Sequence, residues 1–315
     1  MVRLGVVALL VLAIAAPFGL YPIFLMKALC FALFASAFNL LLGYGGLLSF
    51  GHAAFFGGAA YVTAHVVKVM GWPPELGLIA GTAFAAVLGL CFGWLAIRRQ
   101  GIYFAMVTLA LAQMLYFVAL EAKFTHGEDG IQAVPRGKFL GLFDLSDTFT
   151  MYYFVLAIVV LAFWLIYRTV HSPFGQVLKA IRENEPRAIS LGYRVDHYKL
   201  LAFTLSAGLA GLAGSTKALV FQLASLTDVD WRMSGQVVLM TLVGGVGTIF
   251  GPLVGAFILV TMENYLAQFG SWVTVIQGLI FVVCVLTFRK GVVGEIGELI
   301  RRAKGERQRG GGGGH

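Results

Sequence analysis

Long apolar runs alternate with short polar breaks along this chain, and most runs are close to the length of a membrane-crossing helix. A helix needs about 20 apolar residues to cross the hydrocarbon layer, with a range of about 17–25. Runs near that length occupy residues 4–20, 23–42, 51–69, 76–97, 103–120, 151–167, 198–221 and 272–288. The run 234–269 is too long for one crossing, and its interior contains Gly244, Gly245, Gly247, Gly251 and Pro252. The pattern therefore predicts an all-α polytopic membrane bundle of about ten segments, including a glycine-broken helical hairpin.

The composition agrees with lipid as the main solvent. Hydrophobic residues make up 59% of the chain and charged residues 12%, and the mean hydropathy is +0.86. A soluble globular chain carries about 25% charged residues, so a water-soluble fold is excluded. The net charge of +8 does not indicate nucleic-acid binding, because the basic residues lie between the apolar runs without interleaved aromatic residues. Three cysteines stand alone inside apolar runs, which predicts buried side chains and no metal site or disulfide: Cys30, Cys91 and Cys284.

The distribution of Lys and Arg predicts the orientation of the bundle. Basic residues gather at Arg98-Arg99, in the connector 168–199 and in the tail after Arg289. Cytoplasmic loops of membrane proteins carry the excess of Lys and Arg. The number of crossings between these basic segments is even only if 234–269 forms two helices, so parity supports the hairpin independently of its glycines. The sequence predicts cytoplasmic N- and C-termini, a cytoplasmic loop at 171–199 and an external loop at 121–150.

We expect one transmembrane domain over residues 1–309, followed by a linker or tag remnant at 310–315. The first apolar run also fits a secretory signal peptide, because Arg3 precedes it and it contains an A-x-A sequence at Ala13–Ala15. Whether this run is retained or cleaved stays open. Three charged residues near the ends of runs are expected to extend toward the membrane surface, namely Lys27, Lys217 and Glu263.

The connector 171–199 contains its own helix signals. Ser172 suits an N-cap, Pro173 suits the first helical position, and Gly192 suits a C-terminal stop. An apolar stripe recurs at helical spacing, and it consists of Phe174, Leu178 and Ile181. Two short helices along the membrane face are predicted. The stripe suggests a docking surface for another protein, although any polytopic protein also needs a basic loop.

The residues Glu185-x-x-Ala188-x-x-x-Gly192 resemble the EAA-type loop of ABC importer permeases. The frame AIRENEPRAISLGY resembles the LivM subfamily of branched-chain amino acid permeases, which includes urea and amide relatives, and so do stretches at 43–61, 99–113, 125–135 and 242–257. The resemblance implies that this loop inserts into a nucleotide-binding subunit. The coupling residues it implies are Phe174, Leu178, Ile181, Arg182, Glu185, Pro186, Arg187, Ala188 and Gly192. Pro186 and Arg187 replace the two alanines of the general signature.

Two glycine-broken stretches, 43–58 and 244–255, suggest a translocation path, because broken membrane helices are tolerated where they are buried or line a wet cavity. Small residues that let helices pack tightly are the alternative explanation. The candidate path residues are Asn39, Ser49, His52, Gly247, Thr248 and Asn264. In the external loop, Glu128 and Asp129 are candidates for docking a binding protein, or else ordinary solvated residues.

The sequence lacks a G-x-x-x-x-G-K-[ST] phosphate loop and an H-E-x-x-H pair, so we expect a transport subunit without catalysis and without a bound cofactor. The resemblance implies an ATP-driven importer of branched-chain or related amino acids in a bacterial inner membrane. It implies as partners a paralogous LivH-type permease, two ATP-binding subunits that use ATP and Mg, and a periplasmic solute-binding protein. A urea or short-amide importer and an ion-coupled transporter are alternatives, and an intramembrane enzyme would have only Ser49 and His52 to work with.

Overall fold

The structure is a computed structural model, and it describes residues 11–139, 141, 143–266, 268, 272–287 and 291–295. Within these residues the chain is almost entirely helical, as its apolar runs predict. The long helices are α2 (Pro22–Asn39), α3 (His52–Lys68), α4 (Pro74–Ala96), α5 (Ile102–Glu121), α6 (Thr148–His171), α9 (Val195–Phe221), α10 (Trp231–Gly244), α11 (Gly251–Leu266) and α12 (Val273–Thr287). The start of the first apolar run, most of the basic tail and the expected linker at 310–315 lie outside the described residues.

Four candidate membrane spans are long and apolar enough to cross a bilayer: Pro22–Tyr44, Pro74–Ala96, Ile102–Glu121 and Thr148–His171. The predicted membrane bundle is therefore supported, whereas a total of about ten segments stays a prediction. The long run 234–269 does contain two helices, α10 and α11, with a non-helical turn between Gly244 and Gly251. The glycine-broken hairpin is confirmed.

Helix α9 lies at the centre of the bundle and packs against α2, α3 and α4. Small residues make this possible. A Cβ atom at Gly214 would overlap the carbonyl oxygen of Phe56 in α3, and one at Gly211 would overlap Ala85 in α4. Side chains of this size let membrane helices approach until their backbones touch. Packing of helices through small residues thus accounts for many of the glycines.

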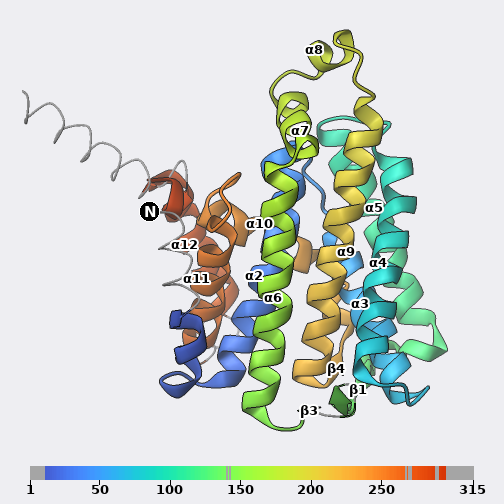
Figure 1. Cartoon of the computed structure of the whole chain (residues 1–315), viewed down its shortest axis with the longest axis vertical. Helices are drawn as coiled ribbons and strands as arrows, with labels where there is room; N and C mark the ends of the chain where they lie inside the picture. The colour runs from blue at the N-terminus through green and yellow to red at the C-terminus, as the bar shows by residue number, and fades with distance from the viewer. Residues whose placement is uncertain are drawn as a thin grey trace, which may run out of the picture.

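The two loops that the sequence places on opposite sides of the membrane do lie at opposite ends of the bundle (Figure 1). Two short helices, α7 (Pro173–Glu183) and α8 (Glu185–Ser190), project from the upper end in that view. The short strands lie at the lower end, where β1 (Ile131–Gln132) pairs antiparallel with β4 (Leu223–Ala224), and β2 (Lys138–Phe139) pairs with β3 (Phe143–Asp144). The β1–β4 pair ties the long loop to the segment that follows α9.

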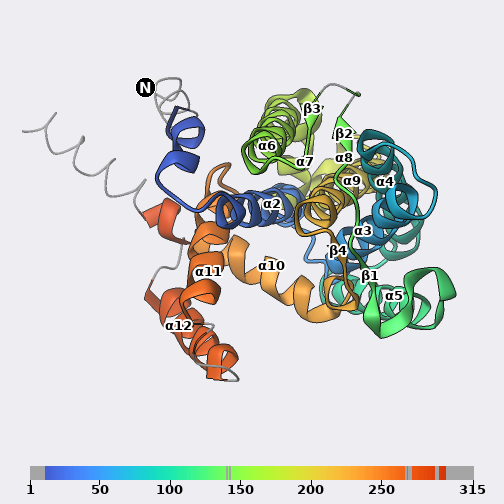
Figure 2. The same ribbon diagram turned by 90° about the horizontal axis from the view of Figure 1, so that it is seen from below.

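Seen from below, α11 and α12 lie to one side of the bundle, and α2 and α10 connect them to it (Figure 2). Outer helices such as α4 carry large exposed apolar side chains, including Ile79, Val87 and Leu90. Exposed apolar surface on this scale suits contact with lipid. Cys30 is buried as predicted, but Cys91 is exposed on α4, so the prediction of burial was wrong there. A cysteine in an apolar run is expected to avoid water, but on an outer membrane helix it can do so by facing lipid without being buried in the protein.

Candidate functional site

The predicted pair of short helices in the connector is confirmed, together with its caps. Ser172 Oγ accepts a hydrogen bond from the backbone N–H of Gly175 at 3.3 Å and so caps α7. Asn184 Oδ1 accepts one from the N–H of Arg187 at 3.1 Å and caps α8. Gly192 has a φ of +87°, a left-handed conformation that only glycine adopts easily, and it follows the end of α8. The connector is therefore built from two capped helices and is not an irregular loop.

The apolar stripe of α7 faces the bundle, which corrects the prediction that it forms an exposed docking surface. Leu178 and Ile181 are buried, and the ring of Phe174 stacks on that of Tyr198 in α9 at 5.6 Å. Ile181 also packs with Ala188 in a small apolar cluster. Helical spacing reveals that a helix has an apolar face, but not which partner covers it, and here the partner is the chain itself.

The exposed apolar residues of the connector lie instead at its tip. Ile189 is 58% exposed and Leu191 is 69% exposed, and Tyr193 is exposed beside them. Pro186 and Arg187 are exposed on the same short helix. The three apolar tip residues are not among those predicted from the sequence. Their signal was present, because Ile189 and Leu191 flank the C-terminal end of a helix too short to bury both faces.

Glu185 points inward and anchors α8 to the bundle. Its Oε1 atom lies 2.6 Å from Lys199 Nζ in α9 and accepts a hydrogen bond from Gln100 Nε2 at 3.0 Å. The Lys199 side chain is only 4% exposed. A buried lysine needs a paired anion, because the desolvation of an unpaired charge is costly. Lys199 and Gln100 were not identified from the sequence, since both contacts depend on the tertiary fold.

Helix α7 rests directly on the first glycine break. Helix α2 ends in a π-helical turn, η2 (Leu40–Tyr44), and the chain then runs without regular structure to α3. The guanidinium of Arg182 donates a hydrogen bond to the carbonyl oxygen of Gly43. Leu178 lies against Gly45, and Lys179 Nζ lies 5.6 Å from the centroid of the Tyr44 ring. The connector and the first break are thus in direct contact.

Asn39 joins the first break to the second. Its Nδ2 atom donates to the carbonyl oxygen of Thr248 at 2.8 Å, and its Oδ1 atom accepts from the N–H of Gly247 at 2.9 Å. Thr248 Oγ1 in turn accepts from the N–H of Gly251 at 3.0 Å, at the start of α11. Three predicted path residues therefore meet in one cluster, because Asn39 contacts Gly247 and Thr248, which lie more than 200 positions later in the sequence.

Ser49 and His52 are fully buried inside this chain. Ser49 Oγ accepts from the N–H of Gly51 at 3.1 Å, and His52 Nε2 lies 2.8 Å from Ser206 Oγ in α9. The rings of Phe38 and Phe203 contact the imidazole from two sides, with centroid distances of 5.0 and 6.2 Å. His52 thus joins the start of α3 to α9, while Ser49 stabilises the turn that precedes α3.

The charged residues near the run ends are paired, which corrects the expectation that they extend separately to the surface. Lys27 in α2 lies 3.2 Å from Glu263 in α11, and Gln236 in α10 donates a second hydrogen bond to Glu263. Lys217 lies 2.6 Å from Asp228 in a buried pair near the β1–β4 end. An ion pair within the fold compensates each charge for its lost hydration, so these side chains need not extend to the membrane surface.

The Lys27–Glu263 pair is partly accessible, with side chains 34% and 20% exposed. Asn264, the sixth predicted path residue, is exposed next to Glu263 and lies apart from the Asn39 cluster. Charged side chains in membrane segments face the protein interior or a water-filled cavity and avoid lipid. The face formed by α2, α10 and α11 is therefore a candidate for contact with another subunit or with a wet path.

In the loop 121–150, Glu128 and Asp129 are exposed on a short 3₁₀ turn (Gly127–Asp129). The loop itself is fixed, because Arg136 donates to the carbonyl oxygen of Val220 at 2.8 Å. A backbone hydrogen bond from Thr150 lowers the pKa of Asp147, which caps α6. No group of three or more His, Cys, Asp or Glu side chains suited to a metal ion occurs in the part of the chain that the structure describes.

The family model "Branched-chain amino acid transport system / permease component" matches residues 21–285. The high-affinity branched-chain amino acid transport system permease protein LivM of Escherichia coli K12 is 29% identical over 323 aligned positions, which cover 92% of this chain and 75% of that protein. LivM of Salmonella typhimurium LT2 is 28% identical with the same coverage. The ribose import permease protein RbsC of Bacillus subtilis 168 is 29% identical over 239 positions, covering 70% of each chain. No solved structure matches the chain significantly.

The family match extends over α2 to α12 and includes the connector and both glycine breaks. Its members are the membrane components of ABC transporters, which carry out transport and no catalysis of their own. The chain belongs to the permease-component family of the branched-chain amino acid transport system.

Proposed function

We propose that this chain forms half of the membrane channel of an ATP-driven importer for branched-chain or related amino acids. The LivM relatives support this substrate class, because they cover 92% of the chain. A ribose permease is also similar over 70% of the chain, so family membership alone does not define the solute. The observation that carries the mechanism is the continuous contact from the connector through Arg182, Gly43 and Asn39 to the second break.

The connector acts as a lever for partner subunits that bind ATP and Mg. The residues that contact those subunits are exposed on α8 or directly after its end, namely Pro186, Arg187 and the apolar tip residues Ile189 and Leu191. Glu185, Ala188 and Gly192 give α8 its position and its end. Phe174, Leu178, Ile181 and Arg182 transmit the movement to the bundle, because they contact α9 or the first break.

The translocation path follows the face of α2, α10 and α11, where a LivH-type partner permease completes the channel. Thr248, Gly247 and Asn264 border this path, while Asn39, Ser49 and His52 hold its wall from within. The partly exposed Lys27–Glu263 pair supports this placement, since a charged pair is unfavourable against lipid.

The α7–α8 end lies in the cytoplasm of a bacterial cell and the strand-bearing end in the periplasm. Residues 1–309 form one domain of about ten segments with both termini inside, because the basic connector and the external loop occupy opposite ends of the bundle. A periplasmic solute-binding protein docks near Glu128 and Asp129, which are exposed at the outer end.

The test is uptake in proteoliposomes that contain this chain, its partner permease and two ATP-binding subunits, with binding protein outside. We expect accumulation of labelled leucine, isoleucine or valine that requires ATP inside, and no accumulation of ribose. Uptake of urea or acetamide in place of these amino acids would assign the short-amide branch. Accumulation by the chain alone, driven by an ion gradient, would contradict the proposal.

A further inference from the structure

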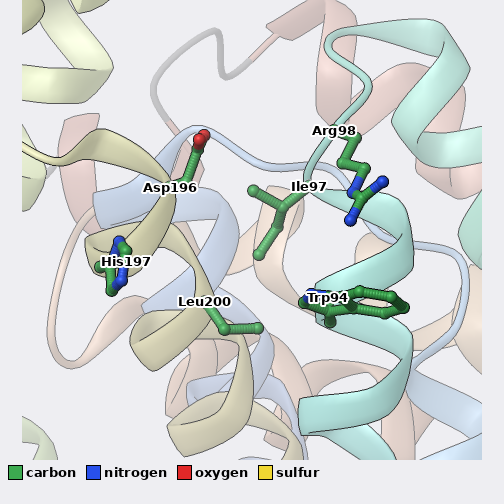
Figure 3. A pocket seen from close by; sticks show the side chains of 7 residues that line it. Trp94, Ile97, Arg98, Asp196, His197 and Leu200 are labelled. Atoms are coloured by element: carbon green, nitrogen blue, oxygen red, sulfur yellow. The ribbon is translucent and has the colours of Figure 1, made fainter.

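A pocket of about 280 Å³ opens at the α7–α8 end of the bundle, between the last turn of α4 and the first turn of α9 (Figure 3). None of its lining residues belongs to α7, α8 or the glycine breaks, although Asp196 and His197 are among the last residues of the connector. The residues that line it are Gly93, Trp94, Ile97, Arg98, Asp196, His197 and Leu200. Gly93, Ile97 and Leu200 give it apolar walls, and Arg98 and Asp196 carry charges at its edge.

The pocket carries opposite charges that do not neutralise each other. Arg98 and Asp196 lie on opposite sides in Figure 3, each at the end of its helix, with Ile97 between them. The guanidinium carbon of Arg98 lies 4.7 Å from the centroid of the Trp94 ring. Neither Arg98 nor Asp196 forms an ion pair with another of the residues that the structure describes. A ligand with its own cation and anion would complement both.

The position of the pocket indicates that its ligand comes from the membrane. Trp94 is 58% exposed and lies one turn from the end of an α4 span that closes with two arginines, Arg98 and Arg99. Tryptophan is typical of the membrane–water boundary. Leu200 lies beside Trp94 in the pocket, one turn further along α9 than Asp196. An amphipathic ligand would place its polar group at the rim and its chains along this apolar wall.

We propose that this pocket binds the headgroup of an aminophospholipid, phosphatidylethanolamine being the simplest. Arg98 donates hydrogen bonds to the phosphodiester, and the primary ammonium donates to the carboxylate of Asp196. The acyl chains leave along Trp94 and Leu200.

The two charges predict selectivity among lipids. Phosphatidylglycerol has the phosphate but no ammonium, so its glycerol hydroxyls offer Asp196 only neutral hydrogen-bond donors. Phosphatidylcholine has a quaternary ammonium, which has no N–H to donate. Loss of one partly exposed charge-assisted hydrogen bond lowers binding about fivefold. The ethanolamine lipid should therefore bind about fivefold more tightly than either of the others.

Native mass spectrometry of the purified full-length chain, mixed in turn with each of the three lipids, tests this directly. The variants are Arg98→Gln and Asp196→Asn, and both side chains are exposed enough for the fold to tolerate the change. Arg168→Gln is the matched control, because Arg168 lies over Trp164 at 5.7 Å at the same end of the bundle but does not line the pocket. Thermal unfolding of each variant checks that it is folded.

We expect the unaltered chain and Arg168→Gln to retain phosphatidylethanolamine about fivefold better than the other lipids, and both pocket variants to lose this preference. Equal retention of all three lipids by the unaltered chain would overturn the proposal, as would a preference that survives in both pocket variants. Displacement of the lipid by an equal concentration of free phosphoethanolamine would also overturn it, because the site would then recognise a soluble molecule and not a membrane lipid.

Discussion

Replacing Asn39 by alanine removes the side-chain hydrogen bonds that join the two glycine breaks. Asn39 is 3% exposed, and its amide bonds to the Gly247 N–H and the Thr248 carbonyl oxygen at 2.9 and 2.8 Å. Alanine leaves both backbone groups without this partner. A buried polar group that loses its partner costs about 1–3 kcal/mol. Since residues 247 and 248 are partly accessible, we take the lower part of that range and expect a loss of about 2–4 kcal/mol for the pair.

A loss of this size changes the equilibrium between joined and separated breaks by more than about 20-fold, because each 1.4 kcal/mol is a factor of ten. The lever still contacts Gly43 through Arg182, so the ATP-binding subunits still bind and hydrolyse ATP. The hydrogen-bonded connection toward α11 is lost, and only the close packing of Gly43 against Gly247 remains. We therefore expect Asn39→Ala to lower amino-acid uptake at least about tenfold in proteoliposomes while ATP hydrolysis continues.

Ser36→Ala is the matched control for this experiment. Ser36 is buried on the same helix, but its hydroxyl bonds only to the carbonyl oxygen of Ala32 within that helix. Its removal should leave the ratio of transport to hydrolysis unchanged. The reasoning is refuted if Asn39→Ala transports normally, or if hydrolysis and uptake fall together to the same extent in both variants.

Three further changes probe the lever and the bundle. Leu191→Asp should abolish co-purification of the ATP-binding subunits with little change in the midpoint of thermal unfolding. Leu178→Asp, at a fully buried site, should prevent folding. Equal effects of the two variants on folding would contradict the assignment of the tip. Lys199→Met leaves the Glu185 carboxylate without its cation and with only the Gln100 hydrogen bond, which should cost about 1–3 kcal/mol. Adding Glu185→Gln should recover part of this loss, as a double-mutant cycle in thermal unfolding would reveal. Gly214→Leu should give no monodisperse protein in size-exclusion chromatography, because even its Cβ overlaps the α3 backbone, and a well-folded variant would show that α9 does not pack this closely.

Local features of the site could be predicted from the sequence because each depends on near neighbours. The Ser172 cap, the Gly192 stop and the broken hairpin follow from rules about hydrogen-bonding side chains and left-handed backbone. The placement of the two loops at opposite ends follows from the distribution of Lys and Arg and from the number of membrane crossings between the basic segments. These are the parts of the fold that the structure supports.

The contacts that join these parts could not be predicted from local pattern. Arg182 and Gly43 are 139 positions apart, and Lys27 and Glu263 are 236 apart. The α7 stripe shows the limit most clearly, since its spacing indicates an apolar face but gives no information on whether a partner or the chain covers it. Because the α7 stripe is buried against the bundle, the candidate contact surface consists instead of Ile189 and Leu191. These two residues are not spaced as one face of a helix.

The central claim is that the connector and the second glycine break move as one body. In a preparation of the whole transporter in nanodiscs, spin labels at Ile189 and Ile249 report the distance between the α8 tip and the second break, and labels at Ile189 and Asp129 report the distance to the outer end. Between the ATP-free and ATP-bound states we predict that the first distance stays constant while the second changes. A first distance that changes with ATP, or a second that does not, would contradict the account.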